Sequence, residues 1–180
     1  MKLIGRVSPK GLKIMDALEA INKRRSIREY KDKLVPKDLL EKIVDAGRYA
    51  ATARDIQPWE FIVITDPAIL TRIAELAVNG NFVSKAKACI AVYSSDTKYY
   101  LEDGCAATQN MLVAATALGI GSCWVAGDKK PYCNDISSLL HVSSAFKLIS
   151  LISLGYPESQ EAFRIKEKRP LSEVLHWEKF

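Results

Sequence analysis

The spacing of hydrophobic positions predicts two helices in the first fifty residues. Between residues 13 and 24, Ile14, Leu18 and Ile21 recur at i, i+4 and i+7, which is the spacing of one face of an amphipathic helix. Pro36 opens a second predicted helix, because proline is tolerated in the first turn, where its missing N–H would have no partner. The buried stripe of this second helix is expected to consist of Leu40, Ile43, Val44, Gly47 and Ala51.

Short apolar runs predict strands in the rest of the chain. The run at 61–64 is followed by Asp66 and Pro67, a helix N-cap and a first helical residue, so a third helix is expected there. A turn is expected at 79–81, where glycine lies between two asparagines. Further strands are predicted at 88–93, 122–126 and 147–154.

The longest predicted helix spans about 99 to 118 and is rich in alanine. It is nearly apolar from Met111 to Leu118, and a helix that is apolar on most sides is buried on most sides. We therefore expect it to be the central helix of the core or of a dimer interface. With a shorter helix expected at 132–141, the order of strands and helices favours an α/β or α+β fold.

The composition excludes several classes of protein. The chain has 180 residues, of which 48% are hydrophobic and 26% are charged, as in ordinary soluble globular proteins. Disordered, collagen-like and coiled-coil chains do not have this composition, and no window approaches the roughly eighteen apolar residues of a membrane span. The length is typical of one domain, so residues 1–180 are expected to form one.

The four cysteines predict a reduced, cytoplasmic protein without a metal site. Cys89, Cys105, Cys123 and Cys133 include no CxxC pair and no histidine at ligand spacing, as a structural zinc site would need. Three of them lie in apolar stretches, where a free cysteine usually behaves as a small buried residue. The first residues contain no apolar segment of the kind found in a signal peptide, so export is not expected.

The segment Arg24-Arg25-Ser26-Ile27-Arg28 has the donors that a phosphate monoester needs. Guanidinium groups present planar pairs of N–H donors to phosphate oxygens, and a hydroxyl adds a further donor. The alternative is a solvated basic helix end that interacts favourably with the helix dipole.

Two other segments are candidates for contact with a flat heteroaromatic ligand. Gln57 in the segment 52–59 can donate and accept in one plane, although this segment could equally be a simple connection to a strand. The glycines of Gly119-Ile120-Gly121 allow a backbone to approach a ligand closely. They do not form a dinucleotide fingerprint, because Trp124 stands where GxGxxG requires glycine.

The net charge of +5 invites an anionic partner without naming one. Residues 23–29 hold four basic residues and one acidic residue, as do residues 164–169, which gives +3 for each segment. The remaining 18 basic and 19 acidic residues give −1. The second segment, by itself, is a basic tail of the usually solvated kind. His141 and His176 stand alone, and no Ser-His-acid or Cys-His set is evident.

Taken in order, four motifs resemble those of the nitroreductase family of flavoproteins. They are RRSIR, QPW, GIGSCW after an alanine-rich helix, and GYP followed by KEKRPLSEVLHW. The resemblance extends from about residue 16 to residue 180. It implies an α+β sandwich with a mostly antiparallel central sheet flanked by helices. It also implies an intertwined homodimer with one FMN per protomer at the interface, and a tail at 158–180 that wraps the partner subunit.

The resemblance assigns a role in FMN binding to particular residues. The first basic motif and the C-terminal basic residues would lie near the phosphate. Residues 51–55 would reach the flavin bound by the other subunit. Asn81 would contact the pyrimidine side of the flavin, and 120–122 would lie near its ring. Ala51-Thr52 and Asp55 depart from the family's Pro-Ser and Asn, so Asp55 is either turned away or tunes the reduction potential. The residues that the resemblance assigns to FMN binding are Arg24, Arg25, Ser26, Arg28, Ala51, Thr52, Ala53, Asp55, Gln57, Asn81, Ile120, Gly121, Ser122, Lys166, Lys168 and Arg169.

The implied activity is a ping-pong oxidoreduction. FMN takes hydride at N5 from NADH or NADPH and then reduces a small acceptor such as a nitroaromatic or quinone, so no catalytic side chain is required. Another flavin chemistry on the same scaffold, reductive dehalogenation or flavin fragmentation, is an alternative. A nucleic-acid-binding module is a further alternative, but its basic runs lack interleaved aromatic residues. Because both basic segments would meet at one phosphate, a small dianion explains the charge better than a long polyanion does.

Overall fold

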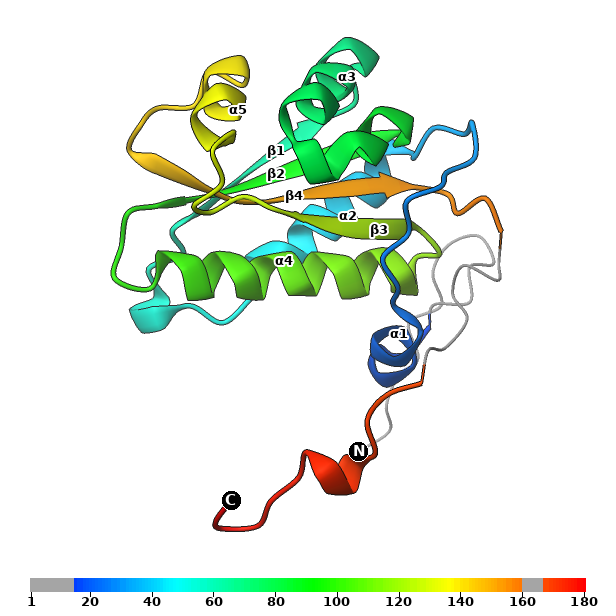
Figure 1. The fold of residues 1–180 in the computed structure, drawn as a ribbon, viewed down its shortest axis with the longest axis vertical. Helices are drawn as coiled ribbons and strands as arrows, with labels where there is room; N and C mark the ends of the chain where they lie inside the picture. Colours follow the sequence, from blue (N-terminus) through cyan, green and yellow to red (C-terminus); the bar gives the residue numbers. More distant parts are fainter. Residues whose placement is uncertain (1–14, 160–166) are drawn as a thin grey trace.

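A computed structural model describes residues 15–159 and 167–180 of the chain (Figure 1). The elements follow one another as strands separated by helices. In chain order they are α1 (Ala17–Lys23), α2 (Lys37–Arg48), η1 (Ala53–Asp55), β1 (Trp59–Ile64), α3 (Pro67–Leu76), η2 (Val78–Lys85), β2 (Ala88–Ser95), α4 (Tyr100–Ala117), β3 (Gly121–Ala126), α5 (Cys133–Leu139), β4 (Phe146–Gly155) and η4 (Leu171–Glu173).

The four strands form one antiparallel sheet in the order β1-β2-β4-β3. Helices α1, α2 and α4 lie on one side of this sheet, and α3, η2 and α5 lie on the other (Figure 1). This arrangement confirms the expected α+β sandwich. The connection from β1 to α3 also follows the prediction, since the Asp66 carboxylate accepts from the N–H of Ala68 at 2.7 Å as the N-cap of α3.

Each face of the sheet carries its own hydrophobic core. Strand β2 is buried on both faces, with Cys89, Ala91 and Tyr93 directed to the α3 side and alternate residues to the α4 side. The central position expected for α4 is confirmed by its buried Met111 and by its packing against α2 and the sheet. A Cβ atom on Gly104 would lie 2.6 Å from Ile149 Cγ1, so glycine allows α4 to approach β4 this closely.

Two of the four cysteines are buried in the core. Cys89 and Cys123 are 0% and 1% exposed, whereas Cys105 and Cys133 are partly exposed, and all four thiols are free. Burial raises the pKa of the Cys89 thiol to about 12. Across the ranges 15–159 and 167–180, the structure has no helix with the length and apolar character needed to cross a membrane.

One expectation about local structure was wrong, and two others differ from the structure in their bounds. Helix α2 ends at Arg48, so Ala51 lies beyond it and is exposed instead of completing its buried stripe. Strand β1 begins at Trp59, two residues before the expected start, because its pairing with β2 continues to Trp59, which lies opposite Ser94. The turn expected at 79–81 belongs to the longer 3₁₀ segment η2.

The apolar face expected for the first helix is present but uncovered within one chain. Leu18 and Ile21 are 72% and 52% exposed, because α1 packs against α4 with Ala20 as its buried residue. Ile14 lies outside the described residues. The described tail, residues 167–180, extends away from the sheet past α1 (Figure 1). The single chain therefore leaves apolar surface exposed at both of these segments.

Candidate functional site

The basic segment Arg24–Arg28 runs alongside the edge strand β3. The N–H of Ile27 donates to the carbonyl oxygen of Ser122 at 2.9 Å, and Ser26 forms a parallel bridge with Ser122. A Cβ atom on Gly121 would lie 2.9 Å from Ile27 Cγ2, so a side chain there would push the segment away. The structure therefore brings the RRSIR and GIGS motifs, far apart in the sequence, into direct contact.

Tyr30 anchors the far end of this segment to the sheet. Its hydroxyl lies 2.7 Å from Ser153 Oγ and donates to the carbonyl oxygen of Ile27 at 2.5 Å. Burial raises the pKa of Tyr30, so the phenol stays neutral at physiological pH. A Cβ atom on Gly155 would lie 2.7 Å from Tyr30 Cδ1, which explains why the aromatic ring can sit directly on the end of β4.

The guanidinium groups of this segment create a positive site at β3. In the part of the chain that the structure describes, no carboxylate forms an ion pair with Arg24 or Arg28. Burial raises the pKa of the neighbouring Cys123 thiol, whereas the charges of Arg28 and Arg24 lower it. Arg25 donates to the carbonyl oxygen of Asn22 at 2.9 Å. This charge favours an anionic ligand.

Ser122, whose backbone carbonyl accepts from the N–H of Ile27, also has a buried hydroxyl. Its side chain is 1% exposed, and its Oγ has no hydrogen-bond partner among the described residues. A buried hydroxyl without a partner costs about 1 to 3 kcal/mol, so such groups are usually satisfied by a ligand or a water molecule. Ile120 and Gly121, which directly precede Ser122 in the chain, are likewise buried.

Asn81 lies close to the same site. Its side chain is exposed in η2, and its carbonyl oxygen accepts from the Ser84 hydroxyl at 2.7 Å. The adjacent Phe82 ring contacts the Arg28 guanidinium, whose central carbon is 5.4 Å from the ring centroid. Arg28 thus contacts the residue next to Asn81, and the role of Asn81 in FMN binding stays a prediction.

The segment 51–57 forms a second cluster of expected site residues, held by α4. The Thr52 hydroxyl donates to Asp103 Oδ2 at 2.9 Å, and the N–H of Ala53 donates to Asp103 Oδ1 at 3.2 Å. The Gln57 side-chain amide donates to Asp55 Oδ1 at 2.8 Å. Asp55 and Gln57 are both exposed, so this loop presents a joined carboxylate and amide to its surroundings.

The basic segment 24–28 and the loop 52–57 lie at opposite ends of α4 in one chain. Asp103, in the first turn of the helix, holds the loop, whereas the basic segment is bonded to Ser122, which lies beyond the C-terminal end of the helix. A helix of 18 residues is about 27 Å long. One small ligand therefore does not reach both clusters within a single chain.

The expected C-terminal contribution is only partly described. Lys166 lies outside the described residues. Lys168 and Arg169 are exposed, and Arg169 forms an ion pair with Glu173 at 3.3 Å within the tail. Within the ranges that the structure describes, neither residue forms a hydrogen bond or ion pair with the basic segment.

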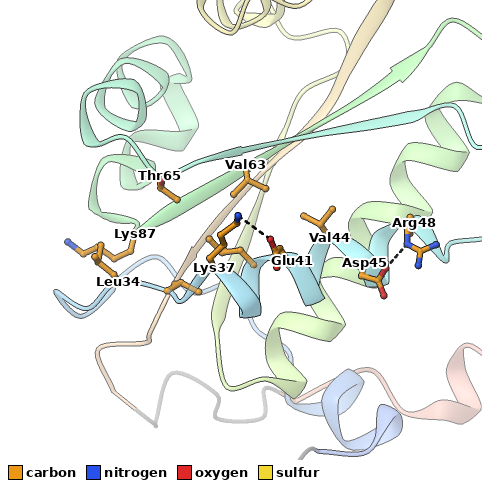
Figure 2. Close-up of a pocket in the computed structure, with 11 residues that line it drawn as sticks. Leu34, Lys37, Glu41, Val44, Asp45, Arg48, Val63, Thr65 and Lys87 are labelled. Atoms are coloured by element: carbon orange, nitrogen blue, oxygen red, sulfur yellow. Dashed lines mark hydrogen bonds and ion pairs between the residues drawn. The ribbon is translucent and has the colours of Figure 1, made fainter. Parts of the chain in front are cut away.

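An apolar groove of about 760 Å³ lies between α2 and the free edge strand β1. Figure 2 shows Val63 of β1 opposite Val44 and Lys37 of α2. Val63 is 41% exposed and Leu34, at the end of the groove, is 75% exposed. Sequence reasoning missed this groove, because it arises only when the second helix and the first strand are placed side by side.

Sequence reasoning also missed Asp103. It is only 5% exposed, and its carboxylate fixes the loop 52–57 from the first turn of α4, outside the nearly apolar stretch from Met111 to Leu118. The available signal was an aspartate inside an alanine-rich helix, since a buried carboxylate normally has hydrogen-bond donors around it.

Comparison with known proteins places this chain in a family and matches its fold. The model of the family described as "Nitroreductase family" matches residues 21–102 and 94–156. A candidate NADH dehydrogenase/NAD(P)H nitroreductase of Archaeoglobus fulgidus is 34% identical over 172 residues, which cover 92% of this chain and 99% of that protein. The structure of an FMN-dependent nitroreductase from Clostridium difficile R20291 matches with a TM-score of 0.80 and 28% identity. That match covers 91% of this chain and 99% of the other.

A more local match concerns a different reaction. Iodotyrosine deiodinase 1 of Sus scrofa is 34% identical over 58 residues, which cover 32% of this chain and 20% of the deiodinase.

Proposed function

The chain belongs to the nitroreductase family, and on that premise we propose that it is an FMN-dependent oxidoreductase. It takes hydride from NADH or NADPH and reduces a small acceptor such as a nitroaromatic or a quinone, in two successive half-reactions at one site. The observation that carries this proposal is the site at β3, where Arg24 and Arg28 have no ion-pair partner among the described residues and the buried Ser122 hydroxyl is unsatisfied.

The residues at β3 fit the chemical groups of FMN. Arg24, Arg25 and Arg28 with the Ser26 hydroxyl supply the charged and neutral donors that a phosphate dianion requires. The backbone at 120–122, with the Ser122 hydroxyl, and the Asn81 side chain supply polar groups for the ring. When bound, FMN provides the hydride chemistry, and the protein provides position and charge.

The charge of the site supports electron uptake without a catalytic side chain. Fixed guanidinium groups stabilise negative charge that develops next to them, and they need no reorganisation to do so. His141 is exposed, and the partly exposed Cys105 and Cys133 have thiol pKa values raised by burial, which disfavours a reactive thiolate. The proposed roles of the side chains are therefore binding and orientation.

We propose that each complete site is formed by two copies of the chain. The loop 52–57 lies about one length of α4 away from the basic segment of its own chain, so it would meet the ligand of a second copy instead. A two-fold homodimer would join the basic segment of one protomer to the loop of the other at both sites. In this arrangement Asp55 and Gln57 would face the FMN bound by the partner.

The tail and the groove support the same arrangement. Leu171, Trp177 and Phe180 of the tail are 70%, 77% and 107% exposed in the single chain. We propose that residues 158–180 wrap the partner subunit and that their apolar side chains enter its groove between α2 and β1. The exposed edge of β1 offers unpaired backbone groups in addition to apolar surface. Residues 1–180 then act as one FMN-binding domain whose last segment is shared between subunits.

Reductive dehalogenation is the second candidate function. The local similarity to iodotyrosine deiodinase 1 of Sus scrofa favours it, but that match covers only about a third of this chain. The two functions share the FMN site and differ in the acceptor. NAD(P)H oxidation with nitroaromatic and quinone acceptors, compared with release of halide from halogenated phenols, separates them.

The visible spectrum of the purified protein tests the cofactor directly. Bound FMN should give its absorption bands in the isolated protein or after reconstitution, and NADH or NADPH should bleach them in the absence of oxygen. A protein that neither contains nor takes up FMN would contradict the proposed function.

A further inference from the structure

We infer that Asp103 is a positioning residue for the reaction, acting through the Thr52 hydroxyl on the loop that presents Asp55 and Gln57. This inference rests on the proposed function, in which the loop meets the FMN of the partner subunit. Asp103 itself would touch neither FMN nor substrate, because it is buried in the first turn of α4 beneath the loop.

The hydrogen bonds join Asp103 to both ends of the loop. Asp103 Oδ1 accepts from the N–H of Ala53, and Asp103 Oδ2 accepts from the Thr52 hydroxyl. The oxygen of that same hydroxyl accepts from the N–H of Gln57 at 3.1 Å. The threonine hydroxyl is therefore a relay that transmits the position of a buried carboxylate to the far end of an exposed loop.

The backbone of the loop needs such a constraint. Arg54, Asp55 and Gln57 have φ values of 57°, 55° and 52°, which lie in the left-handed region that residues with a Cβ atom rarely adopt. No side chain of η1 is buried, so packing does not hold this conformation. The loop is kept in an unfavourable backbone state mainly by polar contacts, of which the Asp103 and Thr52 bonds reach the core of the protein.

The consequence concerns the orientation of the two exposed side chains. With the backbone fixed, Gln57 Nε2 and Asp55 Oδ1 lie 2.8 Å apart and form one polar unit. Release of the clamp would let Arg54, Asp55 and Gln57 return to ordinary φ values, and this unit would separate. Binding of the FMN phosphate would persist, because the basic segment lies at the other end of α4 and belongs to the other subunit.

The substitution Thr52→Val tests the inference, because it removes the hydroxyl while keeping the size and branching of the side chain. We expect kcat with a quinone acceptor, measured at saturating FMN, to fall at least about tenfold. Thr52→Ser should restore most of the loss, since it returns the hydroxyl. Thr71→Val on the exposed face of α3 is the matched control for the exchange itself. Equal turnover in Thr52→Val and the wild type would overturn the inference, as would equal losses in Thr52→Val and Thr52→Ser.

A second measurement does not depend on bound FMN or on activity. Trypsin cleavage after the exposed Arg54, followed by mass spectrometry of the protein without added FMN, reports the mobility of the loop. We expect Thr52→Val and Asp103→Asn to be cleaved there several times faster than Thr52→Ser and Thr71→Val. If cleavage is unchanged, the clamp does not fix the loop and the inference fails. If the wild-type protein binds no FMN, the proposed function fails even where the cleavage pattern is as expected.

Discussion

The backbone N–H of Ile27 donates to the carbonyl oxygen of Ser122 at 2.9 Å, and this bond fixes the basic segment against β3. It joins two motifs that are almost a hundred positions apart in the sequence. The basic segment thus lies directly beside the backbone of β3, and we propose that the two motifs form one site. This relationship is the basis of the proposed phosphate and flavin contacts.

Replacement of Arg24 by alanine should weaken FMN binding by about 1.5 to 3 kcal/mol, the value of a hydrogen bond to a charged group. Titration of the protein with FMN, followed by flavin fluorescence, measures the change. Arg72→Ala is the control, because Arg72 lies on α3 in an exposed ion pair with Glu75. An unchanged FMN affinity in the Arg24 variant would remove this residue from the site.

Replacement of Gly121 by alanine should displace the basic segment. The new Cβ atom would lie 2.9 Å from Ile27 Cγ2 and 3.1 Å from Pro157 Cγ, and overpacking of this kind typically costs about 1 to 3 kcal/mol. Urea unfolding should show the lost stability, and FMN titration should show weaker binding in the folded variant. A variant with wild-type stability and wild-type affinity would show that close contact between the two motifs is unimportant.

Replacement of Val63 by lysine should weaken the proposed dimer. Val63 lies in the groove that the partner's tail would cover, and an unpaired charge buried there is unfavourable. Analytical ultracentrifugation should show a shift toward monomer together with a loss of bound FMN. Val78→Lys is the matched control, since Val78 is 79% exposed in η2, outside the groove. Equal behaviour of the two variants would contradict the proposed role of the groove.

The buried thiol of Cys89 should make stability fall with rising pH. Its pKa is raised to about 12 by burial, whereas an unfolded cysteine ionises near a pH of about 8.5. Above that value the unfolded state binds fewer protons than the folded state, so the free energy of unfolding decreases as pH increases. Urea unfolding between pH 8 and 10 should show a steeper decline for the wild type than for Cys89→Ala. Parallel declines would show that this thiol does not contribute.

Local patterns were sufficient to predict most elements of the fold. The apolar runs predicted the four strands, and Asp66 with Pro67 predicted the start of α3, because these signals depend on neighbouring residues. The end of α2 was predicted wrongly. The small apolar Ala51 fits the helical spacing, but the chain leaves the helix at Arg48, and the loop that follows is held by Asp103.

The arrangement of the site could be predicted only in part. The structure brings the basic motif into contact with Ser122, whereas their joint role at FMN stays a prediction. The sequence alone contains no measure of the distance between that group and the loop 52–57. That separation is set by the length and direction of α4. The exposure of the apolar face of α1 could not be predicted either. Leu18 and Ile21 follow a helical pattern, but no described residue of the same chain covers them.

A hybrid dimer tests most directly whether each FMN site is built from two chains. One protomer would carry Arg24→Ala and Arg28→Ala, and the other, with a different affinity tag, would carry Thr52→Val and Gln57→Ala. In the purified hybrid, one site combines both defective halves and the other combines both intact halves. We therefore expect about half of the wild-type NAD(P)H-dependent turnover per dimer, although each parent homodimer is impaired at both sites. A hybrid no more active than its parents would contradict the account.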